Sequence, residues 1–285
     1  MAHNTETVAV IGAGTMGNGI AHVLALSGRQ VVLIDLDDQR LGLGMETIAT
    51  NMARQVAKGK LSQVEADKAV ALIASETSLD AAASADLAIE AATENPQLKM
   101  KIFADLDRIC GTGVILASNT SSISITSLAA VTGRAAEVIG MHFMNPVPVM
   151  TLVEVILGSE TSAETRDRVA RLARDMGKTP VTVNDAPGFV ANRLLMPMIN
   201  EAIICLDTGV AEALAIDEIM VLGLSHPMGP LKLADLIGLD ICLAIMQVLH
   251  RDLDDDKYRP SSLLETMVSE GHLGKKTGQG FYDYE

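Results

Sequence analysis

Short apolar runs alternate with longer amphipathic segments over the first two thirds of the chain. The runs are rich in Val, Ile and Leu and have the length of strands, at residues 8–11, 31–35, 87–90, 114–117, 138–143, 152–156 and 181–183. The segments between them carry helix signals such as Asn95-Pro96, an N-cap residue followed by proline at the first helical position. This alternation predicts an α/β domain, in which a parallel sheet of buried strands is covered by helices on both faces.

The pattern changes after the turn at residues 185–188. Apolar residues then recur at helical spacing in segments 189–206, 216–222, 231–249 and 262–269, each bounded by Gly, Pro or Asp. A length of 285 residues also favours two domains, at roughly 150 residues each. We therefore expect an α/β domain at residues 1–184 and an all-helical domain for substrate binding and dimerisation at residues 185–285.

A glycine-rich turn follows the first predicted strand. The sequence Gly12-Ala-Gly14-Thr15-Met16-Gly17 places a G-x-G-x-x-G pattern between a strand and a helix, where backbone N–H groups and the helix dipole favour a pyrophosphate. In this pattern Gly12 permits the tight turn, Gly14 allows the ligand to approach the backbone, and Gly17 lets the helix pack on the strand. We expect residues 12–17 to bind a dinucleotide on a doubly wound sheet of Rossmann type.

Asp35 ends the second predicted strand and indicates which dinucleotide binds. It lies about 20 residues beyond the glycines, the spacing at which a carboxylate accepts hydrogen bonds from the adenosine ribose hydroxyls. A negative charge there repels a 2′-phosphate, so the pattern favours NAD over NADP. The alternative is that the glycines form only a turn and that Asp35 caps the next helix.

Composition narrows the class of protein further. The formal net charge is −14 and the sequence pI is about 4.8, which argues against a nucleic-acid or anionic-membrane surface because those need a basic stripe. No apolar run approaches the roughly 18 residues of a membrane span, and the first residues lack the pattern of a secretory signal. Three well-separated cysteines (Cys110, Cys205 and Cys242) suggest reduced thiols, without a disulfide framework or a metal site. A cytoplasmic protein is expected.

Further segments are distinctive in residue type and order. They are Ser118-Asn-Thr-Ser-Ser122, Gly140-Met-His142-Phe-Met-Asn-Pro146-Val-Pro148, Leu152-Val-Glu154-Val, Pro187-Gly-Phe-Val-Ala-Asn192-Arg, His226-Pro-Met-Gly-Pro230 and Gly274-Lys-Lys-Thr-Gly-Gln-Gly-Phe-Tyr282. Together they resemble the 3-hydroxyacyl-CoA dehydrogenase family, most closely its bacterial 3-hydroxybutyryl-CoA members, from about Thr7 to the C-terminus. One departure is Met144, where the family more often has a second Phe after His142-Phe143.

The resemblance implies a catalytic set. His142 would be the general base or acid that exchanges a proton with the substrate oxygen, and Glu154 would accept from the other imidazole nitrogen. Ser121 and Asn192 would hydrogen-bond the substrate oxygen at the reacting carbon. Without the resemblance, His142 could be a structural histidine at a strand end, Ser121 a helix cap, and Asn192 a bridge between helices.

The resemblance also assigns cofactor contacts outside the glycine-rich turn. In such enzymes the positions of Glu94, Lys99, Asn119 and Lys276 contact the dinucleotide.

Arg54 and Lys58 are candidates for the CoA end of a substrate. They lie four residues apart, on one face of a predicted helix, and form a local basic patch in an acidic chain. They could meet the CoA phosphates. The alternative is that these cations only complement the dipole at a helix C-terminus.

The function expected from these features is the interconversion of a short-chain 3-hydroxyacyl-CoA, such as 3-hydroxybutyryl-CoA, and its 3-oxoacyl-CoA with NAD(H). The active site is expected in the cleft between the two domains. Because segment 231–249 is apolar on more than one face, a homodimer through the second domain is also expected. The alternatives are another β-hydroxyacid dehydrogenase and a non-enzymatic NAD-binding structural or regulatory protein on the same fold.

Overall fold

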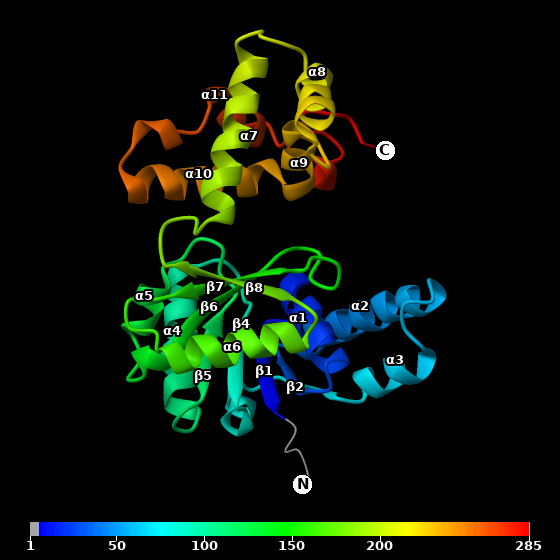
Figure 1. Ribbon diagram of the computed structural model, residues 1–285, viewed down its shortest axis with the longest axis vertical. Helices are drawn as coiled ribbons and strands as arrows, with labels where there is room; N and C mark the ends of the chain where they lie inside the picture. The colour runs from blue at the N-terminus through cyan, green and yellow to red at the C-terminus, as the bar shows by residue number, and fades with distance from the viewer. Residues whose placement is uncertain (1–5, 285) are drawn as a thin grey trace. The chain divides into compact units, whose positions relative to one another are not determined.

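The computed structural model describes residues 6–284 and divides the chain into two compact units, the first ending at Asp185 and the second beginning at Ala186 (Figure 1). The first unit is built on one eight-stranded sheet of order β3-β2-β1-β4-β5-β6-β7-β8. Its strands are β1 (Thr7–Ile11), β2 (Gln30–Ile34), β3 (Ile73–Glu76), β4 (Leu87–Glu90), β5 (Ile115–Ser118), β6 (Val138–Phe143), β7 (Leu152–Leu157) and β8 (Thr179–Asn184). The strand order reverses between β1 and β4, which is where ligands bind in doubly wound sheets.

The prediction of a wholly parallel sheet is wrong at one pair of strands. Strands β1 to β6 run parallel, but β7 is antiparallel to β6 and β8 is parallel to β7. The connection between β6 and β7 covers only residues 144–151, and a parallel crossover needs a dozen residues or more. The reversal places His142 directly opposite Glu154 in the ladder.

The two edge strands also differ from expectation. The sequence pattern does not predict β3, which is short and mostly exposed. Strand β8 is found at the predicted place, but it is an exposed edge strand that includes Pro180 rather than a buried one.

Helices cover both faces of this sheet. They are α1 (Thr15–Leu26), α2 (Asp38–Ala57), α3 (Gln63–Val70), α4 (Pro96–Ile109), α5 (Ile125–Ala129) and α6 (Ala163–Asp175), with short 3₁₀ turns at Leu79–Ser84 and Ala135–Glu137. Helices α1, α2 and α6 share one core with Met141 and Phe143 of β6. Because side chains alternate along a strand, His142 between them points to the opposite face.

The regular elements of the second unit are helices, and isolated β-bridges join Gly274 to Gln279 and Gln279 to Asp283 in its C-terminal segment. The unit contains α7 (Ala191–Asp207), α8 (Ala213–Glu218) with a π-helical turn at Ile219–Gly223, α9 (Pro230–Ile237), α10 (Leu239–Leu253) and α11 (Ser262–Ser269), and 3₁₀ turns at Asp256–Tyr258 and Lys275–Thr277. Its own apolar core includes Met196, Ile203, Leu231 and Leu249.

The prediction of one helix over residues 231–249 is wrong. Gly238 adopts φ +106°, and the chain bends by 99° there between α9 and α10. The carboxylate of Asp217 accepts from the amides of Leu231 (2.9 Å) and Lys232 (3.0 Å), which caps the first turn of α9. Asp235, near the end of α9, accepts from the amides of Phe281 and Tyr282 (both 3.0 Å) and so anchors the C-terminal segment.

Within residues 6–284, no single helix combines the length and the apolar composition of a membrane span, although the bent pair α9 and α10 meets both conditions when taken together.

Candidate active site

The glycine-rich turn has the geometry that its sequence requires. Gly12 adopts φ +104°, and a Cβ there would lie 2.7 Å from the carbonyl oxygen of Ala91, so both the conformation and the space demand glycine. A Cβ on Gly17 would lie 1.7 Å from the carbonyl oxygen of Gly12. Helix α1 therefore approaches the end of β1 so closely that only glycine fits at position 17, in agreement with the close helix–strand packing predicted for this glycine.

The space in front of Gly14 is open. No heavy atom lies within 4 Å of a Cβ placed on Gly14, and no side chain caps α1 there. The first helical residues, Thr15 and Met16, therefore present backbone N–H groups and the positive end of the helix dipole toward that space. This arrangement suits a pyrophosphate.

Asp35 follows β2 and reaches back to the glycine-rich turn. One carboxylate oxygen accepts from the amide of Ala13 and the other from the amide of Leu36, both at 2.7 Å. Each carboxylate oxygen has a further lone pair for a ribose hydroxyl. The turn and Asp35 together fit the pyrophosphate and ribose of a dinucleotide.

His142 and Glu154 form a buried pair across β6 and β7. The distance from His142 Nδ1 to Glu154 Oε2 is 2.7 Å, and the residues are 8% and 2% exposed. When the imidazole is neutral, this hydrogen bond places its proton on Nδ1 and makes Nε2 the basic nitrogen. The pair can therefore accept a proton at Nε2 and stabilise the resulting imidazolium.

Glu94 organises the segment that contains Ser121. Its Oε1 accepts from Thr120 Oγ1 (2.5 Å) and from the Ser121 amide (2.9 Å). The amide and the hydroxyl of Ser122 donate to the same oxygen. Burial would raise the pKa of Glu94, but the Lys99 ammonium and the hydrogen bonds from the 120–122 segment outweigh it and hold that pKa below its usual range. Glu94 is thus a charged acceptor that fixes the position of Ser121.

Lys99 belongs to a buried network at the ends of β4 and β5. It is 1% exposed, and its Nζ donates to Glu90 Oε1 (2.6 Å) and lies 3.3 Å from Glu94 Oε2. Ser118 donates to the other oxygen of Glu90 (2.6 Å). Sequence reasoning missed Glu90 and Ser118, although an acid in an apolar strand, such as Glu90 or Glu154, signals a buried partner.

Asn119 links two strand ends beside the buried pair. Its Oδ1 accepts from the amide of Phe143 (2.9 Å), the residue after His142. The Asn119 amide itself donates to the carbonyl of Glu90 (2.8 Å). Asn119 therefore links the end of β6 to the end of β4, and this structural role does not depend on a bound ligand.

A cavity of about 260 Å³ lies near the start of α1. It is lined by Thr15, Asn18 and Gly19 of α1, by Thr47 and Asn51 of α2, and by residues 145–148 after β6. Arg54 is exposed further along α2 and Lys58 is exposed at its C-cap, and Arg54 Nη1 lies 3.5 Å from Asn51 Oδ1. The predicted CoA patch is therefore on the helix that lines this cavity.

The remaining predicted site residues lie in the second unit. Asn192 is in the first turn of α7 and is 8% exposed. Lys276 pairs with Asp240, with Nζ at 2.5 and 2.6 Å from the two carboxylate oxygens. No group of three His, Cys, Asp or Glu side chains that could hold a metal is found between residues 6 and 284.

Comparison with known proteins identifies both units. Residues 7–186 match the family model described as 3-hydroxyacyl-CoA dehydrogenase, NAD binding domain, and residues 188–284 match the C-terminal domain of the same family.

Individual proteins are similar over nearly the whole chain. A probable 3-hydroxybutyryl-CoA dehydrogenase of Bacillus subtilis (strain 168) is 55% identical, covering 98% of each sequence. The 3-hydroxybutyryl-CoA dehydrogenase of Bradyrhizobium diazoefficiens is 52% identical, covering 100% of this chain and 97% of its own. The crystal structure of an (S)-3-hydroxybutyryl-CoA dehydrogenase from Ralstonia eutropha superposes with a TM-score of 0.96 at 52% identity, covering 99% of this chain and 100% of that one.

Proposed function

The chain belongs to the 3-hydroxyacyl-CoA dehydrogenase family, and from that premise we propose that it interconverts 3-hydroxybutyryl-CoA and acetoacetyl-CoA with NAD(H). The observation that carries the proposal is the buried His142–Glu154 pair on the same sheet as a glycine-rich turn and Asp35. A dinucleotide site supplies the redox chemistry, and the pair supplies the proton transfer that must accompany it.

Residues 12–17 and Asp35 hold the cofactor in this proposal. The open space at Gly14 and the uncapped start of α1 receive the pyrophosphate, and the Asp35 carboxylate receives the ribose hydroxyls. NAD(H) held by these residues would supply the hydride chemistry at C3 of the acyl chain, as acceptor in oxidation and as donor in reduction.

His142 moves the proton. In oxidation its neutral Nε2 accepts the proton of the 3-hydroxyl group, and in reduction the imidazolium returns one to the 3-oxo oxygen. The Glu154 carboxylate stabilises the imidazolium and fixes the tautomer. It does not itself take the proton.

Ser121 positions the reacting oxygen in the proposed mechanism, and Asn192 does so from the second unit. Their hydrogen bonds orient the C3 oxygen and polarise it during reduction. Glu94 and Lys99 act on this step indirectly, since Glu94 holds the Ser121 amide and Lys99 holds Glu94. Lys276 and Asn119 remain candidate cofactor contacts.

The CoA end of the substrate is assigned to α2. Arg54 and Lys58 provide exposed positive charge for its phosphates, and the 260 Å³ cavity beside Asn51 accepts part of the pantetheine arm. The cavity joins α2 to residues 145–148, which directly follow the strand of His142.

We also propose a cytoplasmic homodimer. The three cysteines are free thiols, which fits a reducing compartment. Large apolar side chains are exposed on the second unit, including Leu194, Leu222, Leu224 and Leu236. Association of two copies would remove such side chains from water, and a two-fold dimer is the commonest form of association.

The direct test is NADH consumption by the purified protein with acetoacetyl-CoA, and with acetoacetyl-pantetheine and free acetoacetate as controls. We expect rapid turnover with the CoA ester, a raised KM for the pantetheine ester because it lacks the phosphates, and no turnover with acetoacetate. NADH binding without turnover of any 3-oxoacyl-CoA would contradict the proposal and favour a non-catalytic NAD-binding protein.

A further inference from the structure

Lys178 is a buried cation without a carboxylate partner. It is 8% exposed, and none of the ion pairs between residues 6 and 284 includes it. Burial lowers the pKa of Lys178. A methionine or leucine in this place would avoid the cost of desolvating an ammonium, so the lysine needs a specific explanation.

The ammonium of Lys178 binds one turn of the chain. Its Nζ donates to the carbonyl oxygens of Val147 (2.5 Å) and Met150 (2.7 Å), about 30 residues earlier in the sequence. Within the same turn the amides of Val149 and Met150 both donate to the carbonyl of Pro146 (2.9 and 3.0 Å). The turn is thus closed by its own hydrogen bonds and fastened to the start of β8 by Lys178.

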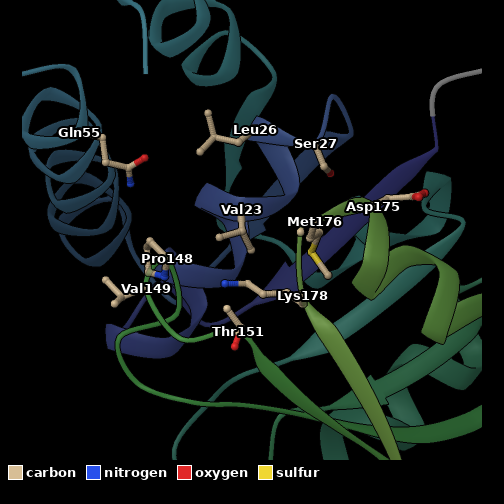
Figure 2. A pocket seen from close by; sticks show the side chains of 11 residues that line it. Val23, Leu26, Ser27, Gln55, Pro148, Val149, Thr151, Asp175, Met176 and Lys178 are labelled. Atoms are coloured by element: carbon tan, nitrogen blue, oxygen red, sulfur yellow. The ribbon is translucent and has the colours of Figure 1, made fainter. Parts of the chain in front are cut away.

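This turn belongs to the connection between the strands of His142 and Glu154, and it separates two cavities. The 260 Å³ cavity beside α1 and α2 is lined by residues 145–148. A larger cavity of about 340 Å³ is lined by Pro148, Val149, Gln55 and Lys178, among others. Figure 2 shows the nitrogen of Lys178 extended toward the segment that carries Pro148 and Val149. Pro148 borders both cavities, so the turn is the wall between them.

The turn is seated on α1 as well. A Cβ on Gly19 would lie 2.8 Å from the Cβ of Val147, and Val147 is 2% exposed. Glycine at position 19 therefore makes the notch into which Val147 fits. Lys178 and Gly19 hold the same turn from two sides.

The surroundings of Lys178 avoid a second buried charge. His22 on α1 is fully buried, its Nε2 lies 3.1 Å from Gln55 Nε2, and its Nδ1 has no partner within residues 6–284. Burial and the Lys178 ammonium lower the pKa of His22 to about 4, so His22 is neutral at physiological pH. Lys178 is therefore the charged member of this buried pair, and its ammonium binds the 146–150 turn.

We propose that Lys178 is a positioning residue for the acyl-CoA substrate, because it fixes the 146–150 turn as the wall of the cavity that receives the pantetheine arm. The inference rests on the proposed function, which assigns that cavity to the substrate. It adds a residue, more than 30 positions from His142, whose loss should weaken substrate binding rather than the chemical step.

The test compares Lys178→Met with Lys178→Arg in the intact protein. For Lys178→Met we expect the KM for acetoacetyl-CoA to rise about tenfold, because a loosened wall misplaces the substrate arm. The kcat should stay within about threefold and the dissociation constant of NADH within about twofold, since His142 and the glycine-rich turn are untouched. Lys178→Arg should recover most of the KM, because it keeps the buried donor. Lys101→Met, which removes an exposed lysine on α4, is the matched control and should change none of these values.

A second variant covers the case in which Lys178→Met does not fold. Lys178→Gln is uncharged and shorter but keeps a buried donor, so it should raise the same KM by less than Lys178→Met does, while leaving kcat nearly unchanged. Wild-type KM in Lys178→Met and in Lys178→Gln would overturn the inference, and so would a loss confined to kcat. Failure of the proposed function is distinguishable, because the wild-type protein would then not reduce acetoacetyl-CoA at all.

Discussion

Asp35 is already oriented by the backbone around it. Its two oxygens accept from the amides of Ala13 and Leu36 at 2.7 Å, which aims the carboxylate at the turn that would hold a pyrophosphate. Replacing Asp35 with Ala removes the charged acceptors for ribose hydroxyls and the repulsion of a 2′-phosphate. We expect the KM for NADH to rise on the order of 10- to 100-fold while use of NADPH improves.

The control for this prediction is Asp37→Ala. Asp37 is two residues further on and accepts from the Arg40 amide as the N-cap of α2, so its loss should reduce stability without changing cofactor preference. An unchanged ratio of NADH to NADPH activity in Asp35→Ala would show that another residue selects the cofactor.

His22 predicts a pH dependence of stability. Burial, and then the Lys178 ammonium, lower the pKa of His22 from its ordinary 6.5 to about 4 in the folded protein. Between these two pKa values the unfolded chain binds more protons at His22 than the folded chain does. The contribution of neutral His22 to the free energy of unfolding is therefore complete above pH 6.5 and is lost as the pH is lowered toward 4. We expect His22→Gln to remove a part of this loss, at most about 3 kcal/mol.

Chemical denaturation at neutral pH and again at about pH 4.5 measures the effect. His272→Gln, which replaces a histidine whose side chain is 37% exposed, is the control. It should show the same fall in the free energy of unfolding between the two pH values as wild type does. An identical fall in the free energy of unfolding in wild type and His22→Gln would contradict the assignment.

At the residue scale, a contact was predictable where a buried ionisable residue needed a partner and the sequence offered one. Glu154 in an apolar strand needed a partner, and His142 was available, so the structure contains the expected contact. Lys99 was different. Its position on a helix face does not reveal that the start of α4 packs over the end of β4, and so its burial against Glu90 emerged only from the fold.

At the scale of elements, strand positions followed from the apolar runs but strand direction did not. Continuous apolar runs indicate strands that are buried on both faces, which favours a parallel sheet, but they do not fix the direction of each individual strand. The short connection 144–151 was the available signal for the reversal at β7. Strand β3 carried too little apolar sequence to be detected, since three of its four residues are exposed.

The break at Gly238 is an element-scale prediction. Because φ is +106° there, Gly238→Ala should strain the junction of α9 and α10 and lower the free energy of unfolding by about 1–3 kcal/mol. Gly42→Ala is the matched control. Gly42 is within α2 with open space around it, so alanine should be neutral or stabilising by up to about 1 kcal/mol. Equal stability of the two variants by denaturant titration would contradict a required left-handed glycine at position 238.

For the whole molecule, the exposed leucines of the second unit predict association. We expect light scattering at micromolar concentration to give twice the 30.1 kDa chain mass. Leu222→Asp, at a residue that is 80% exposed, should shift the mass toward the monomer because it places a charge in an apolar interface. Leu43→Asp, on the exposed side of α2 in the first unit, should leave the mass unchanged. A monomeric wild-type protein would rule out the dimer.

The proposed reaction depends on His142, which exchanges the proton that accompanies hydride transfer. Oxidation of 3-hydroxybutyryl-CoA requires the neutral imidazole, and reduction of acetoacetyl-CoA requires the imidazolium. The limbs of kcat/KM governed by this group should therefore run in opposite directions, rising with pH for oxidation and falling with pH for reduction.

The most direct measurement is the pH profile of kcat/KM in both directions for wild type and His142→Gln. We expect opposite limbs in the wild-type protein and their loss in His142→Gln, with kcat lower by on the order of 10²–10⁴ and NADH affinity nearly unchanged. If His142→Gln kept near-normal turnover and the wild-type pH profile, His142 would not be the acid–base residue and the proton would have to move by another route.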